Sequence, residues 1–96
     1  MLCAMTVRHL KPGSFDAYLD AWKLDAQPPG WTRICTVRGV ADPDEVVSFG
    51  FFDGTMEDLR RSQQEFDYAA QRTRVQELVE STGTDGVFEV VFDTTG

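Results

Sequence analysis

The chain has 96 residues, which is enough for one domain over residues 1–96 and too few for two. Hydrophobic residues make up 42% of it and aromatic residues 11%, so it can form a core and wholesale disorder is excluded. The net charge of −7 argues against a nucleic acid or an anionic membrane as partner, because both select basic surfaces. No segment approaches the roughly 20 apolar residues of a membrane span. We therefore expect a cytoplasmic protein.

The first third of the sequence predicts a strand, a helix and a second strand. Residues 2–10 alternate as a strand, which ends at Pro12-Gly13 because proline cannot donate to a sheet ladder. A helix over about 15–26 is predicted by an apolar stripe at helical spacing, and Pro28-Pro29-Gly30 ends it. The stripe consists of Phe15, Tyr18, Leu19, Trp22 and Ala26. Residues 31–40 then read as a strand whose polar members favour an edge position.

The third predicted strand, residues 46–53, is apolar on both faces. Val47, Phe49 and Phe51 share one face, while the other face holds Val46, Ser48, Gly50 and Phe52. An antiparallel sheet with one wet face alternates cleanly between apolar and polar residues, so two apolar faces require two covers. Helices are expected to cover one face, and a second subunit the other. The small residues Ser48 and Gly50 would allow close approach of a partner's sheet, while the sequence leaves open which of the two faces meets the partner.

A second helix is predicted to start at Thr55, where Asp58 three residues on resembles a capping box. Its apolar stripe slips between Ala70 and Val75, which predicts a kink or break near 67–73. We expect a loop over 81–86 and a last strand over 87–92 that is apolar on both faces.

The element order is therefore strand, helix, strand, strand, helix, strand. This order is typical of the split βαβ, ferredoxin-like α+β fold, with four antiparallel strands in the spatial order 4-1-3-2 and both helices on one face. An unrelated α+β sandwich is the competing arrangement, and the lengths of the crossover connections disfavour it.

Two runs of the sequence resemble a known family. They are Val7 to Gly13, leading into Phe15, Tyr18 and Trp22, and Val46 to Asp53, followed by a capped helix. Together they look like the antibiotic-biosynthesis-monooxygenase-like branch of the dimeric α+β barrel proteins. The resemblance implies a homodimer that pairs sheet against sheet. The activities it implies range from cofactor-free oxidation of phenolic compounds through haem degradation and isomerisation to simple ligand binding.

The candidate catalytic residues are His9, Tyr68 and Arg33. His9 is the only histidine and ends the first strand, where it would act as base or orienting group if it faced a pocket between sheet and helices. Tyr68, beside the expected helix break, and Arg33 would be its polar partners. Candidate substrate-binding residues are Trp22, Trp31, Tyr18 and Phe66. For each of them, packing in the core is the competing interpretation, and for His9 it is a hydrogen bond to a loop or to water.

The sequence predicts no metal site and no cofactor. One histidine and two isolated cysteines give no zinc-type spacing, and Asp42-Pro43-Asp44-Glu45 reads as a solvated turn. The resemblance to haem-degrading members implies a histidine on the second helix, where this chain has none. Two functional hypotheses remain: cofactor-independent oxidation of an aromatic or phenolic compound, and non-catalytic binding of a small hydrophobic or aromatic ligand by a dimeric accessory protein.

Overall fold

The computed structural model describes residues 1–22 and 27–94. The predicted end of the first helix, including Ala26, lies outside these residues. The described helices and strands follow in chain order: β1 Leu2–Leu10, α1 Phe15–Trp22, β2 Trp31–Arg38, β3 Glu45–Phe52, α2 Met56–Glu65, α3 Tyr68–Gln76 and β4 Val79–Glu89. None of the described helices is both long and apolar enough to cross a membrane.

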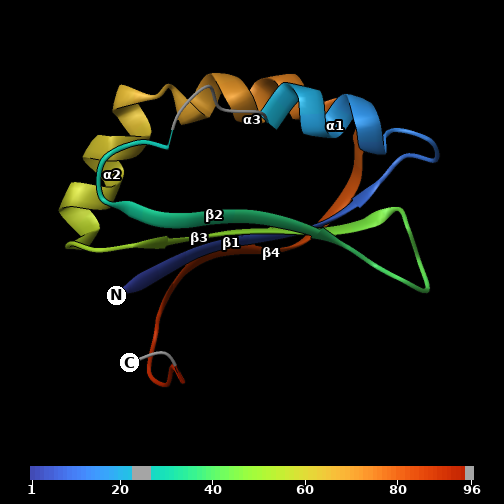
Figure 1. Cartoon of the computed structure of the whole chain (residues 1–96). Helices are drawn as coiled ribbons and strands as arrows, with labels where there is room; N and C mark the ends of the chain where they lie inside the picture. Colours follow the sequence, from blue (N-terminus) through green and yellow to red (C-terminus); the bar gives the residue numbers. More distant parts are fainter. Residues whose placement is uncertain (23–26, 95–96) are drawn as a thin grey trace.

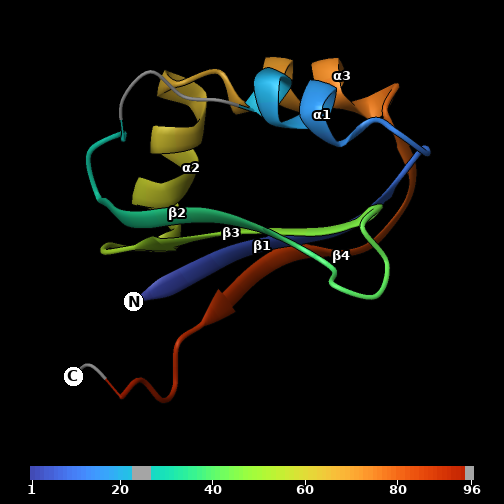
Figure 2. The same ribbon diagram turned by 45° about the vertical axis from the view of Figure 1, so that its right-hand side comes forward.

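The four strands form one antiparallel sheet in the order β2-β3-β1-β4, which confirms the predicted βαββαβ arrangement. All three helices lie on the same face of the sheet (Figure 1). Helices α1 and α3 run side by side over one end of the sheet, and α2 stands over the other end (Figure 2). The opposite face of the sheet carries none of the described helices.

The helix-facing side of the sheet holds the even-numbered residues of β1 and β3. Leu10 and Val46 are fully buried there against Tyr18 of α1 and Val75 of α3. A second cluster packs Trp31 and Phe52 against Leu59 of α2. Because side chains alternate along a strand, this placement also puts Ser48 and Gly50 on the helix-facing side. The expectation that they lie against a partner's sheet was therefore wrong.

Packing explains why position 50 is glycine. A Cβ on Gly50 would lie 2.7 and 2.8 Å from two ring carbons of Trp31. The Trp31 ring therefore covers the glycine, and its indole Nε1–H donates to Ser62 Oγ at 2.9 Å. Gly50 thus lets an aromatic ring from an edge strand lie flat over the centre of the sheet.

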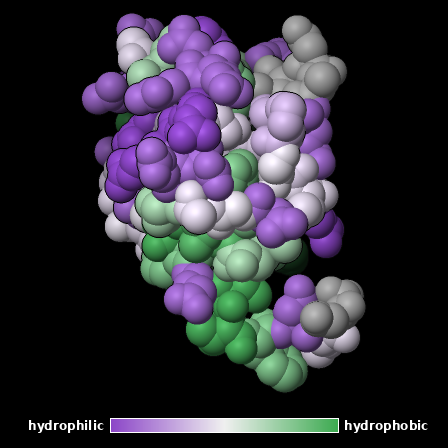
Figure 3. All heavy atoms as spheres, turned by 90° about the vertical axis from the view of Figure 1, so that its left-hand side faces the viewer, coloured by the Kyte–Doolittle hydropathy of each residue, from purple (hydrophilic) through white to green (hydrophobic). Residues whose placement is uncertain are grey.

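The open face of the sheet is lined by the odd-numbered residues of β1 and β3 and by their neighbours on β2 and β4. Its apolar members are Cys3, Met5, Val7, Cys35, Val37, Val47, Phe49, Phe51 and Phe88. Val37 is 45% exposed and Phe88 48% exposed. Figure 3 shows hydrophobic side chains gathered on the lower part of the molecule.

The predicted second helix is broken, as expected, at the start of the predicted range. Asp67 has φ 56°, in the left-handed region, between the end of α2 and the start of α3. The capping box is also confirmed, since the Asp58 N–H donates to Thr55 Oγ1 at 3.1 Å and the Thr55 N–H donates to Asp58 Oδ2 at 3.2 Å. The break places Tyr68 in the first turn of a separate helix.

The prediction of the last strand was wrong at both ends. Strand β4 spans Val79–Glu89, so residues 81–86 belong to the strand and not to a loop. Two register shifts against β1 leave Glu80 and Gly83 without partners on that strand, in the manner of β-bulges. The polar, glycine-containing composition that indicated a loop is accommodated by these bulges at the edge of the sheet.

We expect Gly50→Ala to destabilise the protein by about 1–3 kcal/mol, because the new methyl group overlaps the Trp31 ring. Chemical denaturation followed by tryptophan fluorescence measures this loss. Gly83→Ala is the matched control, since its Cβ would meet only the Val7 carbonyl oxygen at 3.8 Å. Equal stability of the two variants would contradict the packing of Trp31 on Gly50.

Candidate functional site

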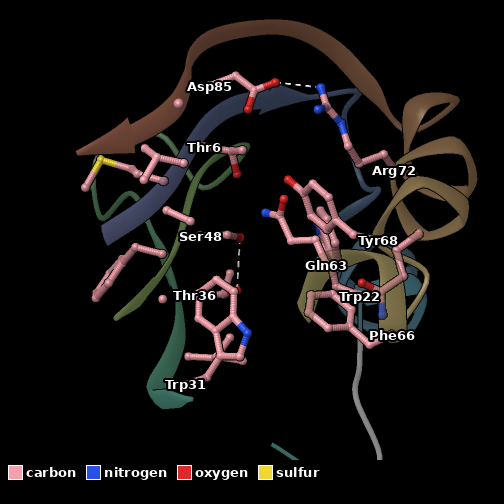
Figure 4. A pocket seen from close by; sticks show the side chains of 18 of the residues that line it. Thr6, Trp22, Trp31, Thr36, Ser48, Gln63, Phe66, Tyr68, Arg72 and Asp85 are labelled. Atoms are coloured by element: carbon pink, nitrogen blue, oxygen red, sulfur yellow. Dashed lines mark hydrogen bonds and ion pairs between the residues drawn. The ribbon is translucent and has the colours of Figure 1, made fainter. Parts of the chain in front are cut away.

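A cavity of about 300 Å³ lies between the sheet and the helices. This volume is at the lower end of the range for small-molecule sites. Figure 4 shows Thr6, Thr36 and Ser48 on the sheet side, facing Gln63, Phe66 and Tyr68 from α2 and α3. The kink after α2 contributes directly, because it brings the first turn of α3 to the cavity wall.

Aromatic rings form much of the cavity wall. Trp22 stacks on Tyr68 with ring centroids 5.5 Å apart and an interplanar angle of 23°. Trp31 meets Phe66 edge to face at 6.3 Å. Trp22, Trp31 and Phe66, three of the candidate substrate-binding residues, therefore line the cavity together. Tyr18 does not line it, because it is fully buried in the core between α1 and the sheet.

Hydroxyl groups on the sheet side connect the cavity to a buried arginine. Thr36 Oγ1 and Ser48 Oγ lie 3.0 Å apart, and Ser48 Oγ lies 3.3 Å from the Tyr18 hydroxyl. That hydroxyl accepts a hydrogen bond from Arg8 Nη1 at 3.0 Å, which leaves its own proton for Ser48. The Ser48 and Thr36 hydroxyls can reorient toward a bound ligand.

An ion pair closes one end of the cavity. Arg72 Nη2 of α3 donates to Asp85 Oδ2 of β4 at 2.5 Å, and the guanidinium of Arg72 lies 5.7 Å from the Tyr68 ring centroid (Figure 4). Burial raises the pKa of Tyr68 above its usual value of about 10, while the charges of Arg72 and Arg8 oppose the rise. Tyr68 is therefore protonated at neutral pH and is suited to donate a hydrogen bond.

His9 and Arg33 lie outside the cavity, so the condition under which His9 would act there as base or orienting group is not met. Its chain neighbours Arg8 and Leu10 face the helices, and alternation turns His9 to the other side of the sheet. There its Nε2 lies 3.7 Å from Asp42 Oδ2. Arg33 pairs with Phe51 on the same open face and is exposed. Of the three predicted catalytic residues, only Tyr68 lines the cavity.

Sequence reasoning missed most of the polar residues in and behind the cavity. They are Thr6, Arg8, Thr36, Ser48, Arg60, Gln63, Gln71, Arg72 and Asp85. One signal was available for two of them, because Thr6 and Arg8 interrupt the face of β1 that also carries Ala4 and Leu10. A polar residue on an otherwise apolar face points to a special role, whereas a polar residue on an exposed face is ordinary.

One group of potential metal ligands is present among the described residues. Ligand atoms of His9, Asp42 and Asp44 lie within 4.8 Å of one another. Asp42 Oδ1 already accepts the backbone N–H of Asp44 at 3.1 Å, as in an ordinary Asx turn. His9 belongs to the open face, so this group is separate from the cavity and adds no chemistry to it.

A comparison with protein-family models finds no match for the chain, and neither does a comparison with curated proteins. Solved structures do match. A candidate antibiotic biosynthesis monooxygenase from Nitrosomonas europaea superposes with a TM-score of 0.79 at 16% identity, over 96% of this chain and 100% of that one. A mutant of SnoaB, a cofactor-independent oxygenase from Streptomyces nogalater, superposes with a TM-score of 0.73 at 14% identity. The match covers 99% of this chain and 97% of that one.

A conserved protein from Methanosarcina mazei gives a TM-score of 0.75 at 10% identity, over 91% of this chain and 89% of that one. At these identities the likeness shows the fold, and a shared fold does not assign an activity. The chain therefore has the ferredoxin-like α+β fold found in structures named antibiotic biosynthesis monooxygenases.

Proposed function

We propose that the chain binds a small aromatic compound in the cavity and oxidises it with dioxygen, without a metal or organic cofactor. The observation that carries the proposal is the cavity itself, in which the Trp22–Tyr68 stack and the edge of Trp31 face a row of hydroxyl groups. Flat aromatic walls with a few convergent polar groups are what a planar ligand requires. The shared fold with a cofactor-independent oxygenase supports the same chemistry.

In this reaction the protein has to bind and orient the substrate, and it supplies no redox group. An acidic phenol or an activated CH₂ group loses a proton, and the resulting electron-rich anion reduces dioxygen. One oxygen atom ends in a new carbonyl group, at the activated CH₂ carbon or at the free para carbon of the phenol, and the other leaves as water with the two hydrogen atoms that the substrate loses. The protein holds the anion, orients it and excludes bulk water. Tyr68 and Gln63 are placed to orient substrate oxygens through hydrogen bonds.

His9 and Arg33 have no part in this proposal, because neither lines the cavity. Tyr68 keeps a role as hydrogen-bond donor, since its raised pKa makes it a poor base at neutral pH. Deprotonation then depends on the acidity of the substrate. The proposed substrates are accordingly those with an acidic phenol or a doubly activated CH₂ group.

Non-catalytic binding is the second candidate function, and one observation favours it. The titratable residues among those described at the cavity are Arg60, Tyr68, Arg72 and Asp85, and Asp85 is held in an ion pair. None of them is a histidine, the usual base near neutral pH. A ligand that is not acidic would bind here and remain unchanged.

We expect at least one compound from a panel of phenols, anthrones and quinols to quench tryptophan fluorescence and to consume dioxygen in proportion to the compound oxidised. Gln63→Phe fills the cavity and should weaken binding tenfold or more. Gln64→Phe is the control, because Gln64 is exposed on the same helix and does not line the cavity.

The outcomes separate the two functions. Oxygen uptake that Gln63→Phe abolishes supports oxidation. Binding without uptake across the panel supports the accessory role, and failure to bind any member contradicts both.

We also propose that a second copy of the chain covers the open face of the sheet. The face carries an apolar row of Val37, Val47 and Val7 across β2, β3 and β1, and Phe88 of β4 lies beside Cys3 and Phe51 near its other end. A contiguous apolar surface of this kind marks an interaction site on most soluble proteins. A homodimer formed sheet against sheet would bury this surface and leave the cavities on the outer sides.

We expect light scattering to give about twice the chain mass of 10.8 kDa at micromolar concentration. Val47→Lys places a charge between Val7 and Val37 on the open face, away from the cavity, and should yield a folded monomer. Leu19→Lys, at a residue 37% exposed on α1, should leave the dimer intact. A folded wild-type monomer at micromolar concentration would defeat the proposal.

A further inference from the structure

A buried arginine lies close to the cavity, and no carboxylate among the described residues forms an ion pair with it. Arg8 of β1 is only 4% exposed. The ion pairs within residues 1–22 and 27–94 all involve other side chains. Two neutral groups lie close to its guanidinium: the hydroxyl of Tyr18 at 3.0 Å and the ring centroid of Trp22 at 5.2 Å. Burying a charge is unfavourable unless an opposite charge compensates it, so this arrangement calls for an explanation.

The position of Arg8 connects it to the cavity through aromatic side chains. Its guanidinium lies over the Trp22 ring, and Trp22 in turn stacks on Tyr68. Arg8 is also near enough to Tyr68 to lower the pKa of the phenol through its charge and a hydrogen bond. Trp22 and Tyr68 both line the cavity. The positive charge of Arg8 therefore acts on any ligand group that lies beside Tyr68 in the cavity.

The charges around the cavity are positive on balance, although the chain as a whole carries −7. The lining supplies Arg60 from α2, Arg72 from α3 and Asp85 from β4, with Arg8 behind it from β1. Arg72 and Asp85 neutralise each other. Arg8 and Arg60 form no ion pair with any described residue. The indole N–H of Trp22 is buried and, within the described ranges, has no acceptor.

We propose that the cavity takes its aromatic ligand as an anion, a phenolate, an enolate or an aryl carboxylate, with the charged oxygen at the Tyr68 end. Tyr68 donates a hydrogen bond to that oxygen, and Arg8 is a positioning residue that supplies the countercharge through Tyr68 and Trp22. The inference rests on the proposed function in one respect, which is that the ligand occupies this cavity. Whether the bound anion then reacts with dioxygen is a separate question.

The test measures the pKa of a bound chromogenic probe. A nitrophenol changes its absorbance on ionisation, so titrations with and without excess protein give the pKa of the bound and the free phenol. In the wild-type protein we expect the bound pKa to lie about one unit below the free value, which corresponds to roughly tenfold tighter binding of the phenolate. The titration stays below the range in which Tyr68 ionises, because burial raises the pKa of that phenol.

Variants assign the effect to Arg8. In Arg8→Met the bound pKa should rise to the free value or above it, because an apolar cavity alone favours the neutral phenol. Arg8→Lys keeps the charge and should restore a lowered pKa. Tyr68→Phe removes the donor, leaves Arg8 in place and should lose part of the shift. Arg61→Met is the control, because Arg61 pairs with Glu57 and Asp58 and does not line the cavity.

A bound pKa at or above the free value in the wild-type protein would overturn the inference while leaving a ligand-binding cavity intact. A bound pKa in Arg8→Met that lies as far below the free value as in the wild-type protein would overturn it as well. If Arg8→Met fails to fold, a bound pKa in Tyr68→Phe that equals the wild-type value overturns the assignment to this pair. If neither the neutral nor the ionised form of the probe bound, the cavity would be contradicted as a ligand site, and the proposed function with it.

Discussion

The rest of the structure depends on the alternation of side chains along β1 and β3, the two central strands. Both strands carry apolar side chains on both faces. Because side chains alternate along a strand, odd or even position decides whether a side chain meets the helices or the open face. On the helix side, Leu10 and Val46 anchor the core with Tyr18. On the other side, the rows through Val7 and Phe49 have no cover from the described chain. A single sheet thus separates the cavity from the surface proposed to meet a partner.

The helix-facing side is not uniformly packed, and the interruptions create the cavity. Ser48 and Gly50 are small, and the hydroxyl groups of Thr6 and Thr36 add polarity where a well-packed core would have aliphatic side chains. Trp31 uses the space over Gly50, and the broken second helix directs Tyr68 inward. A buried guanidinium beside this space disfavours folding, and an anionic ligand would compensate it. Local departures from ideal packing of this kind are expected at functional sites.

Much of the fold could be predicted from the sequence, because its signals are local. Strand alternation and the Thr55–Asp58 box each depend on a few neighbouring residues, and the strand order follows from the element order. Strand β4 was harder, because its first half is polar and is held by backbone pairing to β1 with two bulges.

The site was predictable only in part. Trp22, Trp31, Phe66 and Tyr68 were found because aromatic residues near helix and strand ends lie at a cavity wall in this fold. His9 and Arg33 were misplaced because chemical type was weighed above strand parity: His9 shares its parity with Met5 and Val7. Arg8 was overlooked, although the same parity puts it beside Leu10. The cavity needs the packing of Trp31 on Gly50, which no local pattern reveals.

The most direct test of the two-sided sheet is a methyl-resolved NMR titration with an aromatic anion such as naphthoate. Methyl groups of Ala4, Thr36 and Val87 line the cavity, whereas those of Val7, Val37 and Val47 lie in a row on the open face. At constant protein concentration, we expect the ligand to shift the first set and to leave the second unchanged. Shifts confined to Val7, Val37 and Val47 would place the ligand on the open face and contradict the division of the sheet into a ligand side and a partner side.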